Sequence, residues 1–198
     1  MIDKDSLLLK IKNCNDIKDY IKIVRKYLIH GIPFVFEGNE NGYYDFRAMI
    51  ASYWNVGFHE VLILGSGKLG YSYHKDSKFS LESDIDVAIV NEKLFEDFYM
   101  VIRDFQYDIQ NGKITLSDYE TKQYNVFLQY MIKGWMRPDK LPSKLCGKFS
   151  KKKWFEYFTS ISNFQNPAGN YKISAGLFKN FNYMEKYYVD TLCKLDKY

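Results

Sequence analysis

Residues 61–90 read VLILGSGKLGYSYHKDSKFSLESDIDVAIV and contain two apolar runs, a glycine-rich turn and a pair of aspartates. Val61–Leu64 and Ile85–Val90 are apolar on both alternating faces. This pattern predicts two strands covered on both sides, with the first one central in its sheet. The turn lies between the runs, and the aspartates open the second run. Which chemistry this stretch supports depends on the order of these parts.

The composition is that of a globular chain. Hydrophobic residues make up 46% and charged residues 26% of the 198 residues, which suffice for one domain of ordinary size. No apolar run approaches the roughly 20 residues of a membrane span, and the N-terminus lacks the pattern of a signal peptide. We therefore expect a cytoplasmic protein with no membrane partner. The net charge of +4 permits contact with phosphates without requiring nucleic acid. The three cysteines form no CxxC pair, so neither a disulfide framework nor a zinc site is indicated.

Apolar residues at helical spacing predict helices on both sides of this stretch, and one further apolar run predicts a third strand. Helices are expected at 15–29, 43–54, 93–109, 118–135 and 151–161 and from residue 182 onwards, and the third strand at 171–178. Strands that alternate with helices favour an α/β (α+β) fold with a small mixed sheet and helices packed around it. We expect a single domain, 1–198, with its core at about 58–178, a helical N-terminal segment at 1–57 and a C-terminal helix at 179–198.

The glycine-rich turn matches two phosphate-binding motifs only in part. Gly65 to Gly70 fits G-x-G-x-x-G after a strand, as in a dinucleotide fold. That fold needs a helix before the next strand and an acidic residue after it. Here 13 polar residues without helical periodicity separate Gly70 from Asp84, and the acids precede and open the strand. A P-loop is excluded as well, because Lys68 is followed by Leu69 rather than by serine or threonine.

The two aspartates indicate a metal site instead. Residues i and i+2 of a strand point to the same side, so Asp84 and Asp86 project together while Ile85 points into the core. Their mutual repulsion is relieved when a divalent cation binds between them. Mg²⁺ takes one or two protein carboxylates together with phosphate oxygens, and such sites activate phosphoryl and nucleotidyl transfer.

With these residues in place, the stretch resembles the core of the DNA polymerase β-type nucleotidyltransferase superfamily. The shared motif is an apolar strand, Gly-Ser, a spacer and D-h-D-h, which here reads LILGS at 62–66 and SDIDV at 83–87. The resemblance implies a nucleotidyltransferase-type core, with Asp84 and Asp86 as catalytic ligands of Mg²⁺ or Mn²⁺. It implies that Gly65, Ser66 and Gly67 contact the nucleotide, and Lys68 could add a positive charge near the triphosphate. A lysine exposed to solvent in a loop is an equally good interpretation of Lys68.

The sequence departs from the superfamily pattern in two ways. The spacer is long, so a flap at 71–82 is expected over the site. The third carboxylate, which the superfamily usually takes from a later strand beside the first two, is missing from the strand predicted at 171–178. Asp104, Asp108, Asp118, Glu120 and Asp139 are all possible, and the sequence singles out none of them.

The resemblance implies a Mg²⁺-dependent transfer of a nucleoside monophosphate from an NTP such as ATP to a hydroxyl of a protein, an RNA such as tRNA, or a small molecule. Compact members of the superfamily often act in bacterial toxin–antitoxin or antiviral (phage-defence) systems, which is an analogy only. One alternative is a nucleotide-binding or interaction module of the same fold that is weak or inactive in catalysis, because the third acid is missing. Another is an RNA-binding protein that uses the lysines at 151–153. Trp135 and Trp154 are expected in the core.

Overall fold

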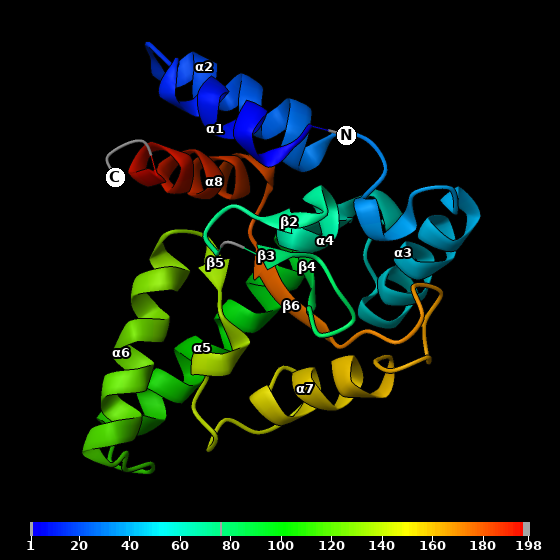
Figure 1. Cartoon of the computed structure of the whole chain (residues 1–198). Helices are drawn as coiled ribbons and strands as arrows, with labels where there is room; N and C mark the ends of the chain where they lie inside the picture. The colour runs from blue at the N-terminus through cyan, green and yellow to red at the C-terminus, as the bar shows by residue number, and fades with distance from the viewer. Residues whose placement is uncertain (1, 76, 196–198) are drawn as a thin grey trace.

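The computed structural model describes residues 2–75 and 77–195. In this part of the chain, eight α-helices surround a four-stranded mixed sheet and a separate two-stranded hairpin (Figure 1). The fold is thus the mixed α/β arrangement that the sequence predicts. Within the described ranges, no helix is long and apolar enough to cross a membrane.

The four-stranded sheet has the order β1-β4-β6-β5. Its strands are β1 (Val61–Leu64), β4 (Ile85–Val90), β6 (Ile173–Phe178) and β5 (Trp135–Met136). β4 runs antiparallel to β1 and parallel to β6, and β5 is antiparallel to β6. In the parallel pair, Asp86 lies opposite Ser174. This register decides which side chains stand beside the predicted metal ligands.

Helices cover both faces of the sheet, as strands with consecutive apolar residues require. One face packs against α3 (Glu40–Trp54), α5 (Glu92–Gln110), α6 (Asp118–Ile132) and α7 (Lys151–Ser160). The opposite face packs against α8 (Phe181–Leu195), and α1 (Lys4–Lys12) and α2 (Ile17–Ile23) lie on α8 in turn (Figure 1).

Short elements connect these helices and strands. They are the π-helix η1 (Val24–Ile29), the 3₁₀ turns η2 (Phe34–Phe36), η3 (Phe58–Glu60) and η4 (Pro138–Lys140), and the one-turn helix α4 (Gly65–Leu69) after β1. Strands β2 (Tyr71–Ser72) and β3 (Ser77–Lys78) form the separate hairpin. The expected flap at 71–82 therefore contains a hairpin, with residue 76 outside the described part of the chain.

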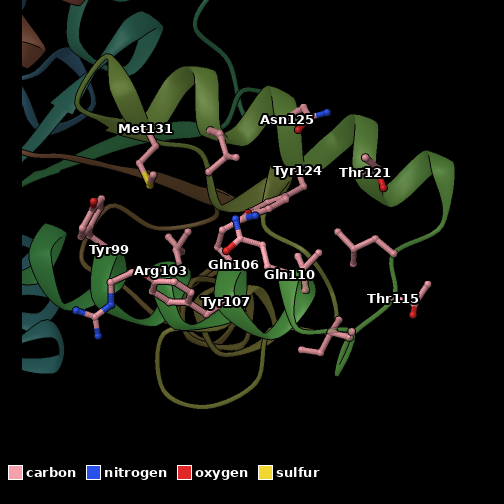
Figure 2. Close-up of a pocket in the computed structure, with 16 residues that line it drawn as sticks. Tyr99, Arg103, Gln106, Tyr107, Gln110, Thr115, Thr121, Tyr124, Asn125 and Met131 are labelled. Atoms are coloured by element: carbon pink, nitrogen blue, oxygen red, sulfur yellow. The ribbon is translucent and has the colours of Figure 1, made fainter.

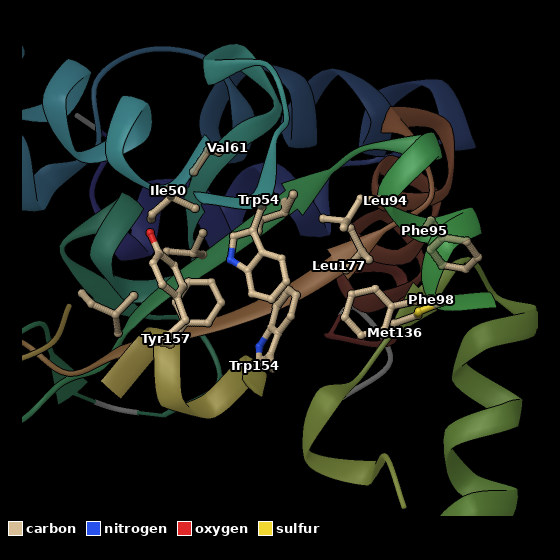
Figure 3. Packing of buried hydrophobic residues seen from close by; sticks show 14 of the residues in the cluster. Ile50, Trp54, Val61, Leu94, Phe95, Phe98, Met136, Trp154, Tyr157 and Leu177 are labelled. Carbon is tan, nitrogen blue, oxygen red and sulfur yellow. The ribbon is translucent and has the colours of Figure 1, made fainter. Parts of the chain in front are cut away.

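Aromatic side chains from three helices meet in the larger core. Trp154 of α7, which is 1% exposed, packs against Trp54 of α3 at a ring-centroid distance of 4.7 Å and against Phe98 of α5 at 5.7 Å (Figure 3). The indole N–H of Trp154 donates to the carbonyl of Ala175 in β6, with a distance of 3.2 Å. The prediction that Trp154 belongs to the core is confirmed.

Several predicted elements differ from the structure. β1 is buried along its whole length but lies at the edge of the sheet, so the prediction that it is central was wrong. Its apolar run reflects two covered faces, which an edge strand can also have. The helix predicted at 118–135 ends at Ile132, because Trp135 and Met136 pair with β6 as a strand. The C-terminal helix predicted to reach 198 is described to Leu195, and 196–198 lie outside the described residues.

Candidate metal and nucleotide site

Asp84 and Asp86 lie where β4 begins, on the side of the sheet that faces α8. Ile85 between them is fully buried in the core on the opposite face, as the alternation of a strand requires. Leu64, the last residue of β1, pairs with Asp86, so the glycine turn that follows β1 begins directly beside this carboxylate. The antiparallel pairing of β1 and β4 thus brings together the two halves of the motif.

Gly65 is the residue that lets the turn approach Asp86. Its φ angle of +61° is one that residues with a Cβ rarely adopt. A Cβ built on Gly65 would lie 2.8 Å from Oδ2 of Asp86, closer than a carbon and an oxygen approach without displacement. Only glycine therefore leaves this face of the carboxylate open to a ligand.

Both aspartates line a pocket of about 880 Å³, within the usual range of roughly 300–1,000 Å³ for small-molecule sites. Gly65 and Ser66 line it at one end. The hairpin supplies Tyr73, His74, Lys75 and Lys78, and α8 supplies Tyr187, Tyr188 and Thr191. β5, η4, α7 and the residue between β5 and η4 also contribute to the lining, with Trp135, Asp139, Phe155 and Arg137. The pocket therefore offers carboxylates, cations and aromatic rings in one space.

The protein around Asp86 makes its charged form costly. Burial raises the pKa of Asp86 above its ordinary value, and the neighbouring charge of Asp84 raises it further, whereas the hydroxyl of Ser174 lowers it by donating a hydrogen bond at 2.8 Å. Burial also raises the pKa of the hydroxyls of Tyr73 and Tyr188, so both are neutral at physiological pH. A cation bound at Asp86 would offset the cost of its charge.

Ser174 of β6 and Lys172, which directly precedes β6, lie beside the two aspartates, and β6 itself carries no acid. The ammonium of Lys172 donates to Oδ2 of Asp84 at 3.0 Å, and Ser174 bonds Asp86. In the described part of the chain, no three acidic, histidine or cysteine side chains gather into a metal-binding group. The strand predicted at 171–178 was placed correctly, and the residues in its site positions are a lysine and a hydroxyl residue. Sequence reasoning missed both, although the alternation of YKISAGLF would have placed them on one face.

Gly67 and Lys68 lie away from this pocket. Gly67 is buried against Ile63 and Phe79, where a Cβ would lie 3.3 Å from a methyl carbon of Ile63. Lys68 is 4% exposed, and its ammonium donates to the carbonyls of His30 and Gly31 at 2.5 and 2.6 Å. It therefore ties α4 to the turn after η1. The burial of Lys68 contradicts the interpretation as a solvated loop lysine, and its ammonium is directed at backbone carbonyls outside the pocket lining.

The burial of Lys68 predicts a pH-dependent stability. Burial lowers the pKa of Lys68 from 10.5 to about 8. Between these values the unfolded chain binds more protons than the folded chain, so the free energy of unfolding gained from this group rises with pH. We expect wild type to gain on the order of 1.5 kcal/mol relative to Lys68→Met between about pH 8 and 9.5. Urea denaturation at both pH values measures this difference, and equal changes in the two proteins would contradict it.

The three lysines at 151–153 share a single carboxylate, that of Glu156, and keep most of their positive charge. Lys151 donates to the carbonyl of Asp139 at 2.7 Å, and Lys153 pairs with Glu156 at 2.8 Å. Lys152 lies 3.7 Å from the same glutamate. The run begins α7, whose other side carries Trp154 into the core. These contacts are typical of a helix start exposed to solvent, and RNA binding by this run stays a prediction.

A second cavity, of about 840 Å³, lies between α5 and α6 (Figure 2). Its lining combines apolar side chains with the amides of Gln106, Gln110 and Asn125. Among the described residues that line it, none is an acid, a histidine or a cysteine, and its one cation, Arg103, pairs with Asp104 at 2.7 Å. The side chains suited to metal or phosphoryl chemistry are therefore those of the first pocket.

Of the six residues predicted from the motif, four line one pocket, namely Gly65, Ser66, Asp84 and Asp86, and Gly67 and Lys68 do not. The residues that the prediction lacked come from β6, β5 and α8, which are distant in sequence. Comparisons with family models, with curated proteins and with solved structures found no match to this chain.

Proposed function

We propose that this chain is a nucleotidyltransferase that moves a nucleoside monophosphate from an NTP to a hydroxyl group in the presence of Mg²⁺ or Mn²⁺. The observation that carries the proposal is the close approach of the Gly65–Ser66 turn to Asp86, in a pocket that Asp84 also lines. The triphosphate of an NTP bound at this turn would lie directly beside the two carboxylates.

The residues fit a divalent cation of the magnesium type. The available donors are the carboxylates of Asp84 and Asp86 and the hydroxyls of Ser66 and Ser174, and hard cations prefer such oxygen ligands. The missing Cβ of Gly65 leaves space against Oδ2 of Asp86. When bound, the cation would supply charge stabilisation to the phosphates.

Other residues that line the pocket suit the phosphates, the nucleobase and the acceptor. Lys75 and Lys78 of the hairpin supply positive charge above the carboxylates, which favours phosphate binding. Phe155, which is 42% exposed and lines the pocket, offers aromatic surface on which a nucleobase or an aromatic acceptor can stack. The acceptor, which is a protein, an RNA end or a small molecule, would enter beside this ring. Action within a toxin–antitoxin or antiviral system remains an analogy.

A second candidate is a nucleotide-binding module with little or no turnover. The specific observation in its favour is that the strand beside the aspartates presents Lys172 and Ser174 rather than an acid. Asp139 lines the same pocket, but it pairs with Arg137 at 3.0 Å, and in the described part of the chain it forms no metal-binding group with the two aspartates. The site therefore has one fewer group to hold a cation and to activate the acceptor hydroxyl. Both candidates require nucleotide binding at Gly65–Ser66.

Label transfer tests the proposal. The protein is incubated with Mn²⁺ and each α-labelled NTP, with total tRNA or cell lysate as the source of acceptor. We expect transfer that the double variant Asp84→Asn, Asp86→Asn reduces by at least about 100-fold, since it removes both metal-binding carboxylates. Nucleotide binding without transfer to any acceptor would favour the second candidate. The absence of both binding and transfer would refute both.

A further inference from the structure

Lys172 neutralises one of the two carboxylates of the candidate site. Its ammonium lies 3.0 Å from Oδ2 of Asp84, and the side chains of Lys172 and Asp84 are 68% and 40% exposed. The backbone holds the pair in place, because the N–H of Ile85 donates to the carbonyl of Lys172 at 2.8 Å. The two residues therefore meet at the start of parallel strands in a fixed register.

This pairing limits how many divalent cations the site can hold. Sites with two metal ions need enough carboxylates to hold both ions about 3.5–4 Å apart. Here Asp86 bonds a serine hydroxyl, Asp84 bonds an ammonium, and no third acidic, histidine or cysteine side chain joins them in the described part of the chain. A single divalent cation between the two carboxylates would compete with Lys172 for Asp84, and Lys172 would remain beside the cation as a second positive charge.

We propose that Lys172 takes the place of a second metal ion, so that the site binds a single divalent cation and Lys172 donates directly to the nucleotide phosphates. This inference rests on the proposed nucleotide site. The flexible side chain of Lys172 can leave Asp84 when the cation binds there, because an exposed ion pair of this kind is weak. Lysine is a common phosphate ligand and acts as a point charge.

The proposal predicts opposite changes in two affinities. In Lys172→Met, Asp84 no longer has a competing cation, so Mn²⁺ alone is expected to bind about 3-fold to 10-fold more tightly. A non-hydrolysable NTP analogue at saturating Mn²⁺ loses a charged contact and is expected to bind about 10-fold more weakly. A purely structural role for Lys172 would weaken both affinities or change neither.

The experiment counts bound Mn²⁺ by electron paramagnetic resonance and measures analogue affinity by calorimetry, with each of the four α,β-imido nucleoside triphosphates. Lys194→Met is the matched control, since Lys194 is also 68% exposed and pairs with an aspartate, Asp190, at 2.7 Å, and neither residue is part of the pocket lining. We expect one Mn²⁺ per wild-type chain with analogue bound, two in Lys172→Asp, and no change in the control.

The outcomes separate this inference from the proposed function. Two Mn²⁺ ions per wild-type chain, or unchanged analogue affinity in Lys172→Met, would overturn the role of Lys172 and leave the nucleotide site standing. Failure of the wild-type chain to bind any analogue, or Mn²⁺, would overturn the site and this inference together. One ion, with the two affinities changing in opposite directions, supports both.

Discussion

The variant Asp86→Asn is expected to melt at a higher temperature than wild type in EDTA at neutral pH, although it loses the metal site. The protein around Asp86 raises the pKa of its carboxyl, so the folded chain binds this proton more tightly than the unfolded chain does. The free energy of unfolding from this group is therefore largest in acid and falls as pH rises through the raised pKa. At neutral pH the full cost of the charge is present, and asparagine removes it while still accepting from Ser174.

The magnitude is modest because solvent reaches Asp86 through the pocket. We expect about 0.5 kcal/mol, or about 1–2 °C in Tm for a chain of this length. Adding Mn²⁺ should reverse the order, since a ligand that binds only the folded state stabilises it by mass action. Wild type should then melt higher, whereas the melting temperature of Asp86→Asn should not change.

Asp84→Asn provides the control for this experiment. Asp84→Asn removes both the ion pair with Lys172 and the repulsion of Asp86, two effects of opposite sign, so its change in Tm in EDTA should be smaller than that of Asp86→Asn. The stability gain of Asp86→Asn should also disappear near pH 3, where wild type carries the proton as well. A lower or equal Tm for Asp86→Asn in EDTA at neutral pH would contradict the prediction that the ionised carboxylate of Asp86 destabilises the folded chain.

The parts of the site that could be predicted from the sequence are those set by residues close together along the chain. Asp84 and Asp86 point the same way because they are two residues apart in a strand, and this needs no knowledge of the rest of the chain. The order of the motif placed Gly65 at the end of one strand and the aspartates at the start of the next, and the pairing of these strands, seen in the structure, brings Gly65 to Asp86. Short-range periodicity therefore sufficed to find β1, β4 and the shared direction of the two carboxylates, but it did not give the place of β1 at the edge of the sheet.

Other parts depend on contacts that no local pattern records. Lys68 points inward because the turn at Gly31, 37 residues earlier, offers carbonyls to its ammonium. Ser174 meets Asp86 because of a parallel register across 88 residues. Trp135 was placed in a helix because its apolar spacing continues that of α6, yet it pairs with Phe178 as a strand residue. In each case a distant partner decided between two locally reasonable structures.

The largest effect on stability is expected from Trp154→Ala. Trp154 is 1% exposed and lies between α3, α5 and β6, in contact with the rings of Trp54, Phe98 and Phe158. Truncation of a large buried aromatic residue leaves a cavity and removes its burial energy, which together cost about 3–5 kcal/mol. Urea denaturation at 25 °C measures this loss. Phe155→Ala, one position further along α7 and at a residue 42% exposed, is the matched control and should cost far less.

Trp154→Phe separates packing from the hydrogen bond and connects the core to the site. β5 pairs only with Leu177 and Phe178 of β6, so the indole of Trp154 supplies the donor for the carbonyl of Ala175. Ala175 directly follows Ser174, and Lys172 lies two residues before Ser174. Phenylalanine keeps most of the buried surface but leaves this carbonyl without its donor, at a cost of about 1–3 kcal/mol.

The same substitution tests whether the indole holds β6 in the position that places Ser174 beside Asp86. In that case the Mn²⁺ affinity of Trp154→Phe should be lower than that of wild type. Phe158→Leu, which changes packing in the same helix, should bind Mn²⁺ as wild type does. A Mn²⁺ affinity equal to that of wild type in both variants would show that the pairing of β6 with β4 is sufficient to position Ser174 beside Asp86.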